Sequence, residues 1–428
     1  MANPGDTVRV ITPDDSVEGI LLPSASQDVV LIKLDNGYNV GIESKNIRKM
    51  VLLEEGKKGS SSLPLRSPAQ KGLPTLTILH TGGTIASKVD YKTGGVYAGF
   101  SAEDFIEMFP EIKTIANVRT RHVANLMSED MRFSHYQLLA KAVKEEIEQG
   151  CAGVIIGHGT DTLAVTSAAL SFMFENLSVP VIIVGSQRST DRGSSDAAMN
   201  LLSAARFIVG SDFAGVGICM HATSSDEYCH IFPATKTRKM HTSRRDAFKA
   251  INDKPIARVH YPSGEITFLK EYVKKSEVQG KLVLRDKLEE KVAVVKTYPN
   301  MSPVIVNALV DAGFKGIILE ATGIGQAPTN IAENLPNYEA LKKFIAQGGV
   351  VVLTSQCIFG RVHADIYSNC RRLKEIGVIF GEDMLTETAL VKLAWLLGNY
   401  PQKEAEKLVA ENLRGEISLR SEYEKEFI

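Results

Sequence analysis

Apolar and polar residues alternate in several short runs near the start of the chain. Residues 7–10 alternate with the two-residue period of a strand, and residues 17–22 and 29–34 are short, mainly apolar runs that predict two further strands. Asn36-Gly37 follows the last of these runs, and because Asn-Gly accepts the positive φ of a tight turn, it predicts a β-hairpin there. Residues 1–53 are therefore predicted to form a small all-β barrel. Such a module is equally typical of a binding domain and of a docking or spacing element.

The composition changes over residues 54–74. Three consecutive serines, Ser60 to Ser62, follow a stretch of glycine, lysine and glutamate, and three prolines come after them. Gly- and Ser-rich sequence is flexible, and proline stiffens the chain. We expect these residues to form a linker.

From residue 75 the pattern repeats as strand, turn and helix. Residues 75–80, 151–156 and 180–184 are mainly apolar runs, typical of parallel strands that are buried on both faces. Residues 134–149 carry apolar side chains at helical spacing, and Gly150 stops the predicted helix. This alternation predicts an α/β fold with a parallel sheet.

A second α/β set is expected to begin near residue 291, with its first strand at residues 292–295. We accordingly divide the α/β part of the chain into two domains, residues 75–285 and residues 286–428. The charged tail, residues 402–428, is expected to be a solvated surface helix.

Charge and cysteine content exclude several classes of protein. The chain has 49 basic and 50 acidic residues and a formal net charge of −1, so no global field attracts nucleic acid. Its five cysteines form no CxxC pair, and His221, Cys229 and His230 match no zinc spacing, so we predict no metal. The polar first residues, the free thiols and the lack of a long apolar run predict no membrane span and a cytoplasmic location.

Two turns follow predicted strands and contain hydroxyl groups. Thr81-Gly82-Gly83-Thr84 places a threonine beside two glycines, where backbone N–H groups are able to stabilise an oxyanion. Taken alone, this turn is more typical of a structural turn, and the Gly-Lys-Ser/Thr of a phosphate-binding loop is absent.

The second turn, within His158-Gly159-Thr160-Asp161-Thr162, sets a hydroxyl beside a carboxylate. That pair is compatible with a proton-transfer chain and with the cap of the following helix. Lys239 is a candidate third member, because a neutral amine accepts a proton from threonine. Its segment, residues 236–249, is strongly basic and is equally typical of a solvated face or a phosphate-binding patch.

The motifs occur together in one order: TGGTIAS, then HGTDT, then a lysine shortly before Asp246-Ala247-Phe248. This combination resembles the L-asparaginase/glutaminase family. The resemblance covers roughly residues 75–428 and implies two asparaginase-like α/β domains.

The same resemblance implies a role for each matched residue. Thr84 is then the nucleophile, and Thr160, Asp161 and Lys239 form a second catalytic group. Within residues 126–131, Ser128 and Glu129 are implied to contact the α-carboxylate and α-amino ends of the substrate. Tyr91 loosely matches the family's lid tyrosine, so Lys239 and this tyrosine both remain candidates for activating Thr84.

The chain differs from a simple asparaginase in its all-β barrel, its linker and its longer connection between the α/β domains. This arrangement is similar to the D subunits of archaeal glutamyl-tRNA(Gln) amidotransferases. The resemblance implies glutamine as substrate, a homodimer, and a heterotetramer with the E subunit, GatE. In such a complex GatE uses ATP and Mg²⁺ to convert Glu-tRNA(Gln) to Gln-tRNA(Gln), and no cofactor is tightly bound to this chain. The alternatives are a free-standing cytoplasmic L-asparaginase and a non-catalytic RNA-binding protein with the same fold.

Overall fold

The structure is a computed structural model that describes residues 6–13, 15–22, 28–34, 39–54, 70–81, 87–89, 96–98, 109–188 and 194–421. The chain divides into two compact units. One comprises residues 1–65 and 88–97, and the other comprises residues 66–87 and 98–428.

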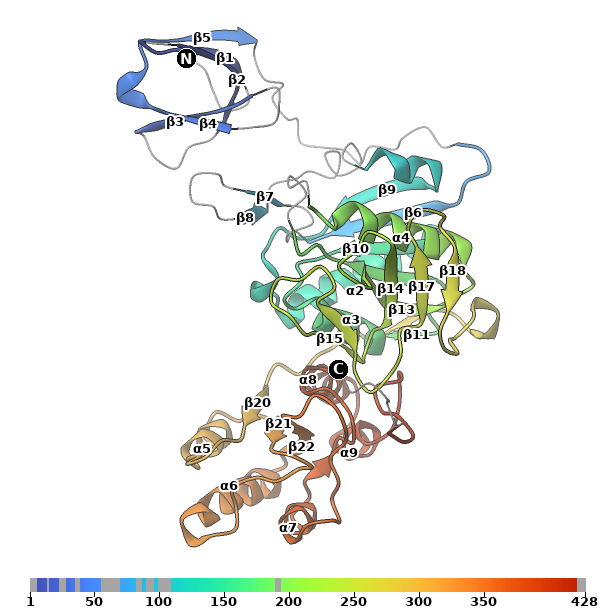
Figure 1. The fold of residues 1–428 in the computed structure, drawn as a ribbon. Coiled ribbons are helices and arrows are strands. Elements are labelled where there is room, and N and C mark those ends of the chain that lie inside the picture. Colours follow the sequence, from blue (N-terminus) through green and yellow to red (C-terminus); the bar gives the residue numbers. More distant parts are fainter. Residues whose placement is uncertain are drawn as a thin grey trace. The chain divides into compact units, whose positions relative to one another are not determined.

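The first unit is built on a five-stranded antiparallel sheet. Its strands are β1 (Thr7–Ile11), β2 (Ser16–Leu22), β3 (Val29–Lys33), β4 (Asn39–Glu43) and β5 (Lys49–Glu54), in the order β4-β3-β2-β1-β5 (Figure 1). One small core serves the sheet and contains Val8, Val10, Leu21, Ile32 and Ile42.

The predicted all-β module is thus a sheet, and no pairing among its described residues closes it into a barrel. The 3₁₀ turn Ser44–Asn46 redirects the chain after β4, so that β5 pairs with β1 instead of β4. β3 and β4 pair antiparallel, as the predicted hairpin requires, whereas Asn36 and Gly37 lie outside the described residues.

The second unit contains an eight-stranded mixed sheet, which confirms the α/β fold class. Five parallel strands make up one side of it: β6 (Thr75–His80), β9 (Asn117–His122), β10 (Gly153–Gly157), β12 (Pro180–Val184) and β13 (Gly215–His221). Three antiparallel strands extend it: β14 (Tyr228–Pro233), β17 (Ala257–His260) and β18 (Ile266–Phe268).

Helices cover both faces of this sheet. Helices α2 (Phe133–Glu148) and α3 (Leu163–Met173) pack with Val154 and Ile156 on one face. Helix α4 (Ala197–Gly210) packs with Ile155 on the other. Every residue of β10 and β12 is buried, which explains why their sequences are continuously apolar.

A smaller parallel sheet follows in the same unit. It is formed by β20 (Val292–Lys296), β21 (Gly316–Ala321), β22 (Val350–Ser355) and β23 (Ile379–Phe380). Its helices are α5 (Val304–Asp311), α6 (Leu335–Ala346), α7 (Ser368–Glu375), α8 (Thr386–Asn399) and α9 (Gln402–Val409). Helix α8 lies between the two sheets and packs against α3, where Phe172 and Trp395 stack at 5.8 Å between ring centroids (Figure 1).

Three two-stranded sheets complete the described elements. They pair β7 (Ser87–Val89) with β8 (Val96–Ala98), β11 (Phe174–Glu175) with β19 (Val283–Leu284), and β15 (Thr237–Lys239) with β16 (Phe248–Ala250). Among the described residues, no helix combines the length and apolar character needed to cross a membrane.

Residues 422–428 lie outside the described residues, and within the described ones the prediction of a solvated helix over residues 402–428 is wrong beyond Val409. Helix α9 ends there, and residues 411–421 continue without helix. Glu416 in that stretch is fully buried and forms an ion pair with Lys392 of α8 at 2.6 Å. One acidic residue of the tail thus neutralises a buried lysine, and a sequence pattern does not distinguish that role from solvation.

Candidate active site

Thr160 and Asp161 follow the carboxyl end of β10, at the edge where open α/β sheets bind ligands, whereas Lys239 ends β15, outside that sheet. Thr84, Tyr91 and the two glycines of the first motif lie outside the described residues. Thr81, the first residue of that motif, is buried, and both its backbone N–H and its hydroxyl donate to the carbonyl oxygen of Gly157, at 3.1 and 3.2 Å. The TGGT turn therefore begins beside the end of β10, where the second motif also begins.

Lys239 joins the residues of the second motif. Its Nζ donates to Thr160 Oγ1 at 2.9 Å and to Asp161 Oδ1 at 2.7 Å. The Lys239 side chain is 15% exposed, whereas that of Asp161 is 64% exposed. The structure thus brings together three of the four predicted catalytic residues, across 78 residues of sequence. We call these three residues the Lys239 cluster.

Two glycines make room for this arrangement. A Cβ atom on Gly185, which follows β12, would lie 2.8 Å from Thr160 Cγ2. A Cβ on Gly159 would lie 2.7 Å from both Cβ and Oγ of Ser128. Such distances are too short for real Cβ contacts, so both positions require glycine if Thr160 and Ser128 keep their places.

The two predicted substrate-contacting residues begin a 3₁₀ turn, Ser128–Asp130. Ser128 is buried against Gly159, and its carbonyl oxygen accepts a hydrogen bond of 2.7 Å from the Thr162 hydroxyl. Glu129, the next residue, is exposed. The structure therefore sets Ser128 next to the motif that contains Thr160, and leaves the Glu129 side chain accessible to a ligand.

Helix capping does not explain Thr160 or Asp161. Helix α3 begins at Leu163, and Thr162 occupies the N-cap position. The hydroxyl of Thr160 and the carboxylate of Asp161 instead accept hydrogen bonds from Lys239. Of the two interpretations of this motif, the structure favours the proton-transfer group.

His158 orients the loop without being available as a base. It is fully buried, and burial lowers its pKa to about 4, with the Gly159 carbonyl opposing that shift. The neutral ring donates from Nδ1 to the Gly159 carbonyl at 2.7 Å and accepts from the Thr166 hydroxyl at Nε2, at 2.9 Å. These bonds fix the carbonyl that immediately precedes Thr160.

The pKa of His158 predicts acid sensitivity of the fold. Between pH 6.5 and about pH 4 the unfolded chain binds a proton at this residue and the folded chain does not, so stability falls as the pH falls through that range. The lowered pKa of His158 corresponds to a loss of about 3 kcal/mol in the free energy of unfolding across this pH range. A His158→Gln protein should be less stable at pH 7 but should lose less stability on acidification, as measured by urea unfolding at several pH values. If the free energy of unfolding of the His158→Gln protein fell as steeply with pH as that of the unmodified protein, His158 would not be the source of the acid sensitivity. His230, whose pKa burial also lowers to about 4, should supply the acid sensitivity that remains.

A buried polar network supports the neighbouring loop, and no motif in the sequence predicted it. The Asp196 carboxylate accepts hydrogen bonds from the backbone N–H groups of Gln187 and Arg188, both at 3.0 Å, and from the Ser186 hydroxyl at 2.9 Å. Asn200 donates to the carbonyl of Gly185 at 3.0 Å. A usable signal existed, because Asp196 directly precedes the apolar sequence of α4 and is its N-cap residue.

The basic segment around Lys239 is largely neutralised by acidic partners. Four of its cations form ion pairs: Lys236 with Asp383, Arg238 with Glu387, Arg244 with Asp246, and Arg245 with Asp226. This pairing disfavours the interpretation as a phosphate-binding patch. Within the part of the chain that the structure describes, no three His, Cys, Asp or Glu side chains are arranged to hold a metal ion.

Comparisons with known proteins identify the family of the chain. Residues 75–274 match the asparaginase N-terminal family model, residues 291–408 match the glutaminase/asparaginase C-terminal domain, and residues 2–53 match the GatD N-terminal domain. The structure is similar to the thermostable L-asparaginase from Thermococcus kodakarensis, with a TM-score of 0.71 and 32% identity over 80% of this chain and 99% of that one. It is also similar to L-asparaginase I from Vibrio cholerae, with a TM-score of 0.71 and 29% identity over 81% of this chain and 100% of that one.

Full-length relatives share all three matched regions. The D subunit of the glutamyl-tRNA(Gln) amidotransferase of Pyrococcus furiosus is 47% identical over 97% of this chain and 94% of that relative. The corresponding subunit of Methanococcus maripaludis is 44% identical over 97% of this chain and 98% of that relative. The chain therefore belongs to the family of glutamyl-tRNA(Gln) amidotransferase D subunits, whose α/β region is of the asparaginase type.

Proposed function

We propose that the protein is the glutaminase subunit of an ATP-dependent amidotransferase and releases ammonia from glutamine through a threonine nucleophile. The observation that carries this proposal is the Lys239 cluster, in which one amine lies within hydrogen-bonding distance of a hydroxyl and a carboxylate. A partly buried lysine, a threonine and an aspartate in this arrangement are not required to fold a parallel sheet. The GatD N-terminal match over residues 2–53 adds the amidotransferase context.

The proposed reaction proceeds by acyl transfer. The Thr84 hydroxyl oxygen attacks the side-chain carbonyl carbon of glutamine, and its proton passes through Thr160 to the Lys239 amine. Backbone N–H groups of the glycine turn stabilise the oxyanion. The C–N bond then breaks, the departing nitrogen takes up a proton and leaves as ammonia, and water hydrolyses the ester to release glutamate. Activation of Thr84 by Tyr91 is the competing route.

Substrate orientation is proposed to come from the 3₁₀ turn beside Gly159. Ser128 is assigned to the α-carboxylate and Glu129 to the α-ammonium group. The burial of Ser128 and the exposure of Glu129 support this division, because a fixed hydroxyl and an accessible carboxylate suit opposite ends of an amino acid. The proposed domains remain 1–53, 75–285 and 286–428, with a linker at 54–74.

The proposed partner is the E subunit, GatE, which would use ATP and Mg²⁺ to amidate Glu-tRNA(Gln) in the cytoplasm. This chain is proposed to form a homodimer within a heterotetramer and to meet the tRNA only through that complex. The near-neutral net charge and the paired arginines of the basic segment support an indirect contact with tRNA.

A free-standing L-asparaginase is the second candidate, supported by the 32% identity to the asparaginase of Thermococcus kodakarensis. That enzyme covers 80% of this chain, whereas the amidotransferase relatives cover 97%. The amidotransferase role is therefore favoured.

Ammonia release from glutamine and from asparagine distinguishes the two candidates. We expect the full chain to prefer glutamine, and its rate to rise when GatE, ATP, Mg²⁺ and Glu-tRNA(Gln) are present. Thr84→Ala, which removes the proposed nucleophile, serves as the control for contaminating glutaminase. Efficient asparagine hydrolysis that is indifferent to the partner would establish the alternative, and ammonia release by Thr84→Ala at the normal rate would overturn the proposed chemistry.

A further inference from the structure

The last described segment of the chain contacts both elements that support the Lys239 cluster. We call residues 413–418 the tail segment. Thr160 and Asp161 precede α3, and Lys239 ends β15. These two elements meet the tail segment at their other ends, away from the Lys239 cluster.

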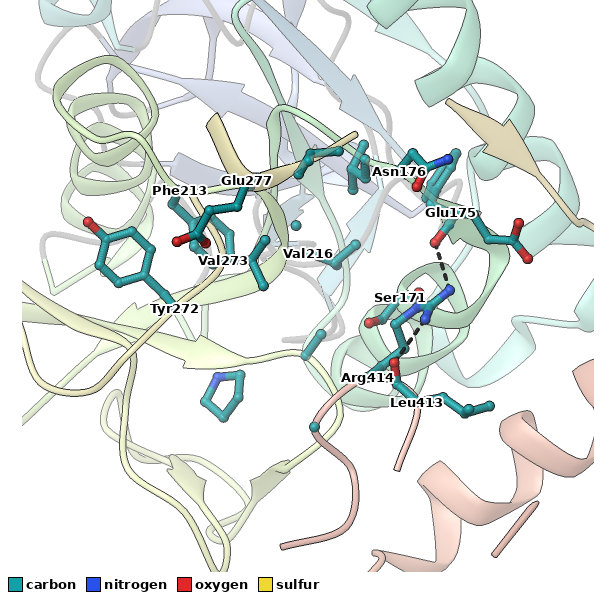
Figure 2. A pocket seen from close by; sticks show the side chains of 18 of the residues that line it. Ser171, Glu175, Asn176, Phe213, Val216, Tyr272, Val273, Glu277, Leu413 and Arg414 are labelled. Atoms are coloured by element: carbon teal, nitrogen blue, oxygen red, sulfur yellow. Dashed lines mark hydrogen bonds between the residues drawn. The ribbon is translucent and has the colours of Figure 1, made fainter. Parts of the chain in front are cut away.

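The first contact is made at the carboxyl end of α3. Arg414 donates from Nε to the carbonyl oxygen of Ser171 at 2.9 Å and from one terminal nitrogen to that of Phe174 at 3.2 Å. Figure 2 shows Arg414 reaching toward Ser171 along the wall of a pocket. The last carbonyls of a helix lack partners within it, so a guanidinium that satisfies two of them fixes the position of the helix.

The second contact is made at the start of β15. The carbonyl oxygen of Arg414 accepts a hydrogen bond of 3.1 Å from the Thr235 hydroxyl. Lys236, which is 1% exposed, forms an ion pair with Asp383 and donates to the hydroxyl of Ser418 at 2.7 Å. The backbone N–H of Ser418 donates to the same carboxylate at 2.9 Å.

These contacts matter because β15 is held in place by tertiary contacts and not by a large sheet. It pairs with β16 over three residues and belongs to neither large sheet. A short two-stranded ribbon is marginal in isolation, so tertiary contacts decide where its side chains lie. Lys236 and Lys239 are three residues apart, one directly before β15 and the other at its end, so we expect a displacement of the backbone at Lys236 to move the Lys239 amine.

We propose that Lys236, Asp383 and Ser418 are positioning residues that hold β15 so that Lys239 reaches Thr160 and Asp161. The inference rests on the proposed glutaminase function. Lys236 and Ser418 act through Lys239 and do not touch the substrate. The carboxylate of Asp383 connects the tail segment and β15, since it accepts hydrogen bonds from both.

The buried ion pair between Lys236 and Asp383 also favours a fixed position of β15. Burial lowers the pKa of Lys236, and the Asp383 carboxylate opposes that shift. The side chains of both residues are at most 2% exposed, so removing Lys236 leaves the Asp383 carboxylate with only a longer ion pair, to Arg361 at 3.8 Å, and removing Asp383 leaves Lys236 buried without its ion-pair partner. We expect the two-stranded ribbon of β15 and β16 then to shift, so that Lys239 moves away from Asp161.

Steady-state ammonia release from glutamine by the full chain, with its partner subunit present, tests the proposal. Lys236→Met should lower kcat by about 10–100-fold, because a misplacement near 1 Å costs on the order of a hundredfold, while KM stays within about twofold. Lys236→Arg, which keeps the cation, should restore kcat to within about threefold of the unmodified protein. Ser418→Ala, a milder change that keeps the backbone bond to Asp383, should lower kcat by about three- to tenfold.

Two controls separate positioning from loss of folding. All assays are run at least ~20 °C below the unfolding midpoint of each variant, since local instability alone also lowers activity. Lys141→Met removes a different ion pair of the same unit, between Lys141 and Asp286 at 3.2 Å, and should leave kcat unchanged.

The outcomes distinguish this inference from the proposed function. If the unmodified protein releases no ammonia, both ideas fall. If Lys239→Met is equally active, the positioning role falls, while a glutaminase whose Thr84 is activated by Tyr91 remains. If activity depends on Lys239 while folded Lys236→Met and Ser418→Ala keep the normal kcat, only the positioning role is overturned. A loss in kcat that Lys236→Arg reverses, with KM unchanged, supports it.

Discussion

Replacing Lys239 by methionine should lower the kcat for glutamine hydrolysis by about a thousandfold, the size expected when a group that transfers a proton in the transition state is removed. Methionine has a similar length and keeps most of the packing of the lysine stem, but it has no amine. The hydroxyl of Thr160 and the carboxylate of Asp161 would then lose the donor that joins them. Since neither group is assigned to substrate binding, KM should change little. Steady-state ammonia release over a range of glutamine concentrations measures both constants.

A matched control is available on the same hairpin. Lys249 lies on β16, is exposed, and pairs across the ribbon with Arg238. Lys249→Met should therefore keep nearly full activity. Lys239→Arg should remain impaired, because a guanidinium stays protonated and does not accept a proton at neutral pH. Near-normal kcat in Lys239→Met would remove Lys239 from the mechanism and favour activation of Thr84 by Tyr91.

Local sequence predicted the sheets of this protein well. The strands predicted at residues 75–80 and 180–184 are confirmed at those limits, and the helix predicted at 134–149 lies at Phe133–Glu148. The two strands are buried between the cores on the two faces of the sheet, and the helix packs in one of these cores, so the apolar pattern of each element directly records its packing. The limits of β10 differ by up to two residues from the prediction, because apolar residues continue into the preceding turn.

The site was harder to predict, because its residues meet through tertiary contacts. Lys239 is one of six lysines and arginines within fourteen residues, and nothing in their spacing distinguishes it from its neighbours. Only the order of motifs shared with asparaginases identified it. The structure supplies the physical reason: Lys239 reaches Asp161, whereas Lys236, Arg238, Arg244 and Arg245 each have another acidic partner.

The charged tail was predicted wrongly for a related reason. A run of lysine and glutamate is usually a solvated face, and the amphipathic helix α9 fits that pattern. Beyond it, Glu416 accepts the backbone N–H groups of Leu413 and Arg414, at 3.0 and 2.6 Å, and the ammonium of Lys392. No local pattern reveals that these two charges, far apart in the sequence, are both fully buried. Such pairs are recognised only when the three-dimensional partners are known.

The Lys392–Glu416 pair should therefore contribute strongly to stability. The Lys392 ammonium uses its donors on Glu416 at 2.6 Å, on the carbonyl of Val409 at 2.9 Å and on that of Glu411 at 2.5 Å. Burial lowers the pKa of Lys392, and the Glu416 carboxylate opposes that shift. Both side chains are completely inaccessible. Removing the Lys392 ammonium would leave the Glu416 carboxylate buried without a counter-ion. It would also leave the carbonyls of Val409 and Glu411 without this hydrogen-bond donor.

Lys392→Met should accordingly destabilise the α/β unit by about 3–5 kcal/mol, the cost of breaking a buried ion pair on one side. Lys407→Met is the matched control, because Lys407 forms an exposed pair with Glu411 at 3.8 Å, and its loss should cost less than about 1 kcal/mol. Urea unfolding followed by the fluorescence of Trp395, the single tryptophan of the chain and a residue of the same helix as Lys392, reports the change. Adding Glu416→Gln to Lys392→Met should recover part of the loss, since the isolated carboxylate is then removed while an amide oxygen still accepts a backbone N–H. If Lys392→Met and Lys407→Met lowered the free energy of unfolding by the same amount, the buried ion pair would contribute no more to stability than an exposed one.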